Sequence, residues 1–174
     1  TDAELARLPL SDPGVANMEA WLGSLYLRVG RFQDAYHWTH LALLHRREHL
    51  PPHAMPIGDA YTQLAKVFLE SGEAAAAEVQ LDRAAEIYRI AGDAGKAKAI
   101  AVQAQWAGLC LMQGRLSEAE RRYDTMMVAQ AATLGNQHPD LAQTLNNLGG
   151  VYVAQGRMDK ALGAYDHALQ MQAA

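Results

Sequence analysis

Apolar side chains recur at three- and four-residue steps along most of the chain, and the C-terminal part shows this most clearly. One face of a predicted helix there carries Leu141, Leu145, Leu148 and Tyr152. Steps of this size indicate amphipathic helices rather than strands. Gly156 follows this face, and glycine ends a helix readily because it adopts the left-handed cap conformation at little cost. A second apolar stripe comes next, so the pattern predicts a helix, a tight turn and another helix.

This hairpin pattern occurs four times at a constant spacing. The turn glycines are separated by 42 residues each and are Gly30, Gly72, Gly114 and Gly156. An alanine follows each glycine by five residues, a glycine or alanine precedes each by seven, and a large apolar residue precedes each by eight. Small side chains let two antiparallel helices approach closely, and large ones fill the neighbouring space. The sequence therefore predicts four repeats, at about residues 15–50, 57–92, 97–134 and 138–173.

These residue types, in this order, resemble the tetratricopeptide repeat. The segments "HPDLAQTLNNLGGVY" and "QGRMDKALGAYDHAL", with the 42-residue period, are most similar to the longer subtype of kinesin light chains. The resemblance covers about residues 15–172 and is weakest in the first repeat. Thr39 stands where other repeats have an aromatic residue, and Met126 replaces a small one. The resemblance implies an all-α, right-handed α-solenoid of four antiparallel helix-turn-helix repeats that serves as a non-catalytic interaction module.

The first 14 residues fall outside the repeats. We expect residues 1–14 to form an N-terminal extension or loop. Ser11 or Asp12 is then expected to cap a helix that begins near Val15, because these side chains accept hydrogen bonds from the first free backbone N–H groups.

Net charge, the lengths of apolar runs and the cysteine count limit which kinds of partner and cellular setting we expect for the protein. The 174 residues carry a net charge of −4, whereas nucleic-acid binders need a basic face, so we expect no nucleic-acid partner. No apolar run approaches the length of a membrane span, and we expect no membrane partner. The single cysteine, Cys110, excludes an internal disulfide and favours a reducing, cytoplasmic setting. The alanine-rich style favours a bacterial parent protein, of which this chain, which does not begin with Met, is expected to be an excerpt or a processed form.

A histidine-rich stretch raises one catalytic alternative. His45, Glu48 and His49 form the pattern H-x-x-E-H of inverted-motif zinc peptidases. The repeat places them at the end of a second helix, which we expect to be exposed to solvent and where cationic residues are favoured by the helix dipole. A catalytic zinc also needs a third protein ligand and a shaped pocket. We therefore expect no cofactor, no catalytic residue and at most adventitious metal binding at His45 and His49.

Candidate binding residues lie beside the apolar stripe on the first helix of each repeat. In stacked helical repeats these first helices line the concave face. Trp21 lies nine residues before the first turn glycine, and the same position of the later repeats holds Gln63, Gln105 and Asn147. The side-chain amides of these three residues can both donate and accept hydrogen bonds with a peptide backbone. The kinesin-light-chain resemblance implies that Asn147 contacts a bound peptide. The predicted partner-binding groove consists of Trp21, Ser24, Gln63, Lys66, Leu69, Gln105, Leu111, Asn146 and Asn147.

The leading functional hypothesis is a scaffold that binds a peptide or partner segment in this groove. The alternative is a peptide-sensing regulatory domain that controls an attached output domain, and the distant alternative is the zinc peptidase. The last predicted helix carries apolar residues that need cover, so either more repeats follow in the parent protein or this end docks on another copy. For the isolated chain we expect self-association through the C-terminal repeat.

Overall fold

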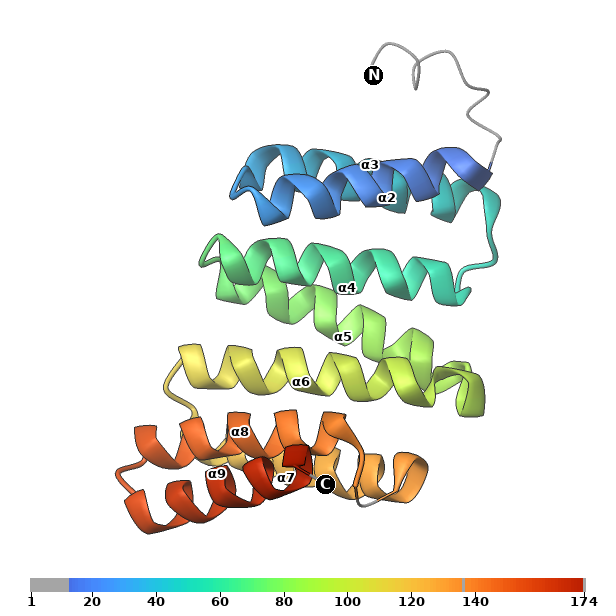
Figure 1. Ribbon diagram of the computed structural model, residues 1–174. Helices are drawn as coiled ribbons and strands as arrows, with labels where there is room; N and C mark the ends of the chain where they lie inside the picture. The colour runs from blue at the N-terminus through green and yellow to red at the C-terminus, as the bar shows by residue number, and fades with distance from the viewer. Residues whose placement is uncertain (1–12, 136, 174) are drawn as a thin grey trace. The chain divides into compact units, whose positions relative to one another are not determined.

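The structure is a computed structural model that describes residues 13–135 and 137–173 (Figure 1). It divides into two compact units, Thr1–Ala99 and Ile100–Ala174, and each is described by itself. The elements in chain order are α2 (Pro13–Arg28), α3 (Phe32–His49), α4 (Met55–Glu70), α5 (Ala74–Ile90), η1 (Gly92–Gly95), α6 (Lys96–Met112), α7 (Leu116–Leu134), α8 (Pro139–Ala154) and α9 (Met158–Ala173). All described elements are helical, which confirms the predicted fold class. The expected caps Ser11 and Asp12 lie outside the described residues.

The four predicted turn glycines end α2, α4, α6 and α8. Their φ angles lie between 71° and 82°, in the left-handed region that glycine enters without strain. In each turn the residue after the glycine donates its N–H to the carbonyl four residues before the glycine, at 2.7–3.0 Å. This bond closes a Schellman motif and satisfies carbonyls that the helix end leaves free. The prediction that glycine separates the two helices of each repeat is confirmed.

In the first unit, α2 packs on α3, α3 on α4 and α4 on α5. The close approach depends on the small residues that the repeat predicts. A Cβ added at Gly23 would lie 2.2 Å from the hydroxyl oxygen of Thr39, so α2 and α3 meet at this glycine. Ala65 and Ala77 are fully buried at the corresponding positions of α4 and α5. Any larger side chain there would push the paired helices apart.

In the second unit, α7 packs on α8 and α8 on α9. A Cβ added at Gly149 would lie 2.6 Å from the ring of Tyr165, which repeats the glycine contact of the first hairpin with a larger partner. A buried apolar cluster joins the two last helices and consists of Leu141, Ala142, Leu145, Ala168 and Met171. Trp106 and Cys110 of α6 are buried, as their repeat positions predict.

The connections between hairpins differ from one another, as their sequences suggest. Pro139 opens α8, and the His138 side chain accepts a hydrogen bond from the N–H of Asp140 at 3.2 Å. Proline suits this first turn because its missing N–H has no partner there. The segment before α6 instead forms the short helix η1, whose Gly95 lies against the backbone of Tyr88.

Candidate functional site

Two predicted groove residues of the first unit bind each other within the fold. The Gln63 side-chain amide on α4 donates to the carbonyl of Ala20 at 3.0 Å and to the hydroxyl of Ser24, both on α2. The Ser24 hydroxyl also donates to the Ala20 carbonyl at 3.1 Å. These bonds place the first helices of neighbouring hairpins side by side. They also engage the Gln63 amide in holding α2 to α4.

Trp21, Lys66 and Leu69 complete the predicted groove of this unit. Trp21 is 64% exposed although it lies mid-helix, and Lys66 is exposed on α4. Leu69 is half-buried. A large exposed aromatic side chain that is not needed for the core is a typical anchor for a binding partner.

The predicted residues of the second unit have three different environments. The side-chain oxygen of Gln105 on α6 is buried, with no hydrogen-bond donor among the described residues. On α8, Asn147 accepts a hydrogen bond from Gln143 at 3.2 Å, while Asn146 is exposed. Leu111 is half-buried. Of these residues, Asn146 is therefore the one whose polar atoms are fully open to a partner.

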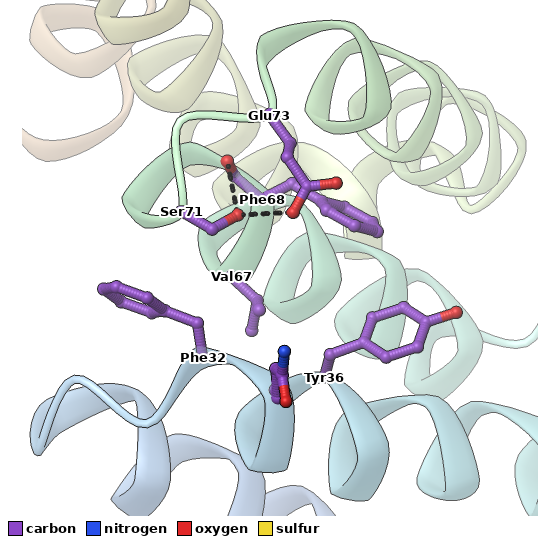
Figure 2. A pocket seen from close by; sticks show the side chains of 7 residues that line it. Phe32, Tyr36, Val67, Phe68, Ser71 and Glu73 are labelled. Atoms are coloured by element: carbon purple, nitrogen blue, oxygen red, sulfur yellow. Dashed lines mark hydrogen bonds between the residues drawn. The ribbon is translucent and has the colours of Figure 1, made fainter.

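A cavity that the sequence did not indicate lies where α3 packs on α4. We call this contact between α3 and α4 the first junction. This cavity of about 550 Å³ is open to solvent. Figure 2 shows Phe32 and Tyr36 on the α3 side, with Val67 and Phe68 opposite them on α4. The Tyr36 and Phe68 ring centres are 5.6 Å apart. At the rim, the Ser71 hydroxyl donates to the Glu73 carboxylate at 2.9 Å. The remaining lining residue is Gln33.

Comparison with known proteins supports the repeat assignment. A family model for the tetratricopeptide repeat matches residues 98–174. The structure of BtubC (BKLC) from P. vanneervenii is similar, with a TM-score of 0.80 and 25% identity over 93% of this chain and 65% of that chain. A putative kinesin light chain of Podospora anserina with nearly identical TPR-like repeats gives a TM-score of 0.77 at 19% identity, over 99% of this chain and 82% of that one. The chain therefore has the fold of tetratricopeptide repeat proteins, and its residues 98–174 match that family.

The fold is similar to that of kinesin-light-chain-like repeat structures, as the 42-residue period suggests. A Rap protein complexed with competence and sporulation factor has the same fold, with a TM-score of 0.79 at 17% identity, over 92% of this chain and 43% of that chain. No curated protein matches the chain. The chain spans less than two thirds of the length of the BtubC chain and of the Rap chain. Tetratricopeptide repeats generally form non-catalytic interaction scaffolds.

The histidine stretch has a structural role in the first tetratricopeptide repeat. His45 is buried against α2, and its Nδ1 lies 2.8 Å from Oε2 of Glu19. We expected this helix end to be exposed, and for His45 that was wrong, because α3 turns this side chain towards α2. Glu48 and His49 are exposed. No group of three metal-ligating side chains occurs in the described part of the chain.

Glu19 belongs to a buried polar cluster that the sequence analysis also missed. Burial raises the pKa of the Glu19 carboxyl, and the hydrogen bond with His45 opposes this effect. Next to it, the Arg46 guanidinium donates to the carbonyl of Pro56 at 2.9 Å and to the side chain of Asn17 at 3.2 Å. Burial lowers the pKa of Arg46. These bonds hold α3 to α2 and to the start of α4. The sequence signal was a glutamate at a repeat position where the second and fourth repeats have Tyr61 and Leu145, although the third has the polar Gln103.

Each helix that the structure describes is too short or too polar to cross a lipid bilayer.

Proposed function

We propose that this protein is an interaction module that binds a peptide or an extended segment of a protein partner. The observation that carries the proposal is the open aromatic cavity of the first junction, because three aromatic side chains from two helices line it without filling it. Binding sites in proteins are concave and mostly apolar, with a few polar groups that fix orientation. Glu73 and Ser71 supply such groups at the rim.

The predicted groove residues supply further candidate contacts, separately within each unit. Trp21 and Lys66 stay accessible on α2 and α4, and Asn146 stays accessible on α8. We propose that Trp21 is an apolar anchor for the partner, and that Asn146 and Asn147 bind its backbone in the second unit. Gln63 and Ser24 act indirectly, since their side chains already hold α2 to α4. Of the remaining groove residues, Leu69 and Leu111 contribute apolar contact, whereas the side-chain oxygen of Gln105 is buried and does not reach the partner.

A random peptide library displayed on phage tests the proposal when it is selected on the immobilised chain. Selected peptides are expected to bind the variant Trp21→Ala, Tyr36→Ala at least about tenfold more weakly, because buried aromatic anchors dominate binding energy. The matched control is Asp82→Ala, Arg121→Ala, which changes exposed side chains on second helices and leaves affinity unchanged. Circular dichroism checks that helicity is retained. Selection of no peptide, or equal binding to the first variant, would refute the proposal.

A peptide-sensing regulatory role is the second candidate, and the similarity to a Rap protein complexed with competence and sporulation factor favours it. In this reading peptide binding changes the arrangement of the hairpins and so controls an attached output domain. The buried Cys110 fits a reducing, cytoplasmic setting in a bacterial cell. Small-angle scattering with a selected peptide separates the two roles, because an unchanged radius of gyration favours the simple scaffold.

We also propose that the chain associates with itself through its C-terminal repeat. Leu169 on α9 is 63% exposed, whereas Leu43, at the same repeat position on α3, is 3% exposed because α4 covers it. Met158 and Leu162 are exposed on the same helix. A second copy that covered α9 as α4 covers α3 would bury these residues. Light scattering is expected to show a mass that rises with concentration, and a strict monomer would contradict the proposal.

A further inference from the structure

Each repeat turn brings the residue after the glycine against the residue four before it, because the Schellman hydrogen bond joins their backbones. In the first repeat the guanidinium carbon of Arg31 lies 4.8 Å from the centre of the Tyr26 ring. In the fourth repeat Arg157 lies 4.9 Å from Tyr152 in the same way. A guanidinium over an aromatic face is attracted by the ring's negative quadrupole. In these two repeats the turn therefore places a cationic side chain over an aromatic ring.

The second repeat has an aromatic ring four residues before its turn glycine but has a carboxylate, not a cation, directly after it. The residues after the four glycines are Arg31, Glu73, Arg115 and Arg157. The second repeat thus has Phe68 as its aromatic residue and a carboxylate where two other repeats place a guanidinium over a ring. This exchange occurs at the cavity of the first junction, which both residues line.

The junction of α7 and α8 shows what occupies the corresponding space elsewhere in the chain. There the Arg157 guanidinium donates to both carboxylate oxygens of Glu120, at 2.8 and 2.9 Å, and Gln155 donates to the same carboxylate at 2.9 Å. In the first junction the position of Glu120 is taken by Tyr36, and that of Gln155 by Ser71. No ion pair therefore spans the first junction at these positions.

We propose that this cavity binds an arginine side chain of the partner peptide. This inference rests on the proposed function and adds the chemistry of its partner. The guanidinium lies over the Phe68 ring, as Arg157 lies over Tyr152, and pairs with the Glu73 carboxylate. No cation of the described chain forms an ion pair with Glu73, and the nearby Arg31 already binds Asp34 at 2.8 Å. Arginine suits the site better than lysine because its planar group both stacks and donates in pairs.

The volume of the cavity specifies one further feature of the peptide. About 550 Å³ exceeds what a guanidinium fills, and Phe32 and Val67 form an apolar wall beyond the Phe68 ring. Apolar surface left in contact with water favours an apolar partner. The bound segment therefore carries an apolar residue next to its arginine.

The test uses the blocked tripeptide acetyl-Leu-Arg-Leu-amide and the same peptide with citrulline, which keeps the shape of arginine and removes its charge. Titration of the full chain, followed by NMR, is expected to shift the ring resonances of Phe68 and Tyr36. Citrulline is expected to weaken binding at least about tenfold, because it loses both the charged hydrogen bonds and the cation–π attraction. Glu73→Gln should weaken the arginine peptide to a similar extent.

Glu73→Arg is the sharpest variant, because it restores the arginine of the other repeats and fills the cavity from the chain itself. It is expected to abolish peptide binding without loss of helicity. Arg121→Ala, an exposed change in the second unit, is the control that keeps wild-type affinity. Equal binding of the citrulline peptide, retained binding by Glu73→Arg, or shifts confined to other residues would overturn the inference. The proposed function would still stand if phage-selected peptides bound Trp21 and Tyr36 without any preference for arginine.

Discussion

The first and last hairpins place opposite chemistry at the same repeat positions. Between α2 and α3 the buried pair is Glu19 with His45, whereas between α8 and α9 the equivalent pair is Leu145 with Met171, which lies in the apolar cluster. The junctions show the reverse. The first junction is aromatic and open, and the junction of α7 and α8 is bridged by Glu120 and its partners.

This difference shows which features the repeat backbone requires and which it leaves free. Both hairpins have the same turn, the same small residues at the helix contact and the same buried alanines. A hydrogen-bonded polar pair and an apolar pair both satisfy the same buried position, provided that each is complete. Likewise, the junction of α7 and α8 is closed by an internal ion pair, whereas the first junction stays open. The positions that vary are therefore where this chain acquired its specific properties.

Breaking the buried pair of the first hairpin should have the largest effect. Glu19→Leu alone leaves the buried His45 without its carboxylate partner and removes one of the two carboxylates near Arg46, and it is expected to lower the free energy of unfolding by about 3–5 kcal/mol. The double variant Glu19→Leu, His45→Met copies the last hairpin and is expected to match or exceed wild-type stability. Urea denaturation followed by circular dichroism measures both. A double variant as unstable as the single one would show that the two hairpins are not equivalent at this position.

Removing the charge that closes the junction of α7 and α8 should have a smaller effect. Glu120→Gln weakens the bonds from Arg157 and Gln155 and is expected to cost about 0.5–1 kcal/mol, because both side chains of the ion pair are partly exposed. The matched change in the first junction, Tyr36→Phe, removes a hydroxyl for which no hydrogen bond is seen in the described chain and should cost almost nothing. Urea denaturation at low salt compares the two variants, and equal losses would contradict the contrast.

The same carboxylate gives a pH dependence. The hydrogen bond from Gln155, together with the bond and charge of Arg157, holds the pKa of Glu120 below its ordinary value against the opposing effect of burial. Its contribution to stability is therefore fully present above the unfolded pKa of about 4.3 and is lost as the pH falls through the lower folded pKa. Glu120→Gln should be less stable than wild type at neutral pH and approach it in acid. A constant difference across this range would contradict the assignment.

Much of the fold could be predicted because helix periodicity and turn glycines are local signals. In the sequence alone, Gly30 and Gly156 mark the turns, and Ala77 and Gly149 mark the helix contacts. The candidate site was less predictable. Spacing selected Trp21 as accessible, and it is, but spacing alone did not show that Gln63 would bind Ser24 on the next hairpin.

By itself, the sequence determined the helical class, the turn glycines and the small buried residues at the helix contacts, because these depend on contacts within 42 residues of chain. Only the tertiary structure showed that His45 pairs with Glu19 and that Phe32, Tyr36 and Phe68 surround a cavity. These features depend on how a helix packs against its neighbours, and on side-chain directions that spacing does not specify. The repeat determines the position of each residue on its helix, and the packing of the helices determines which neighbours its side chain contacts.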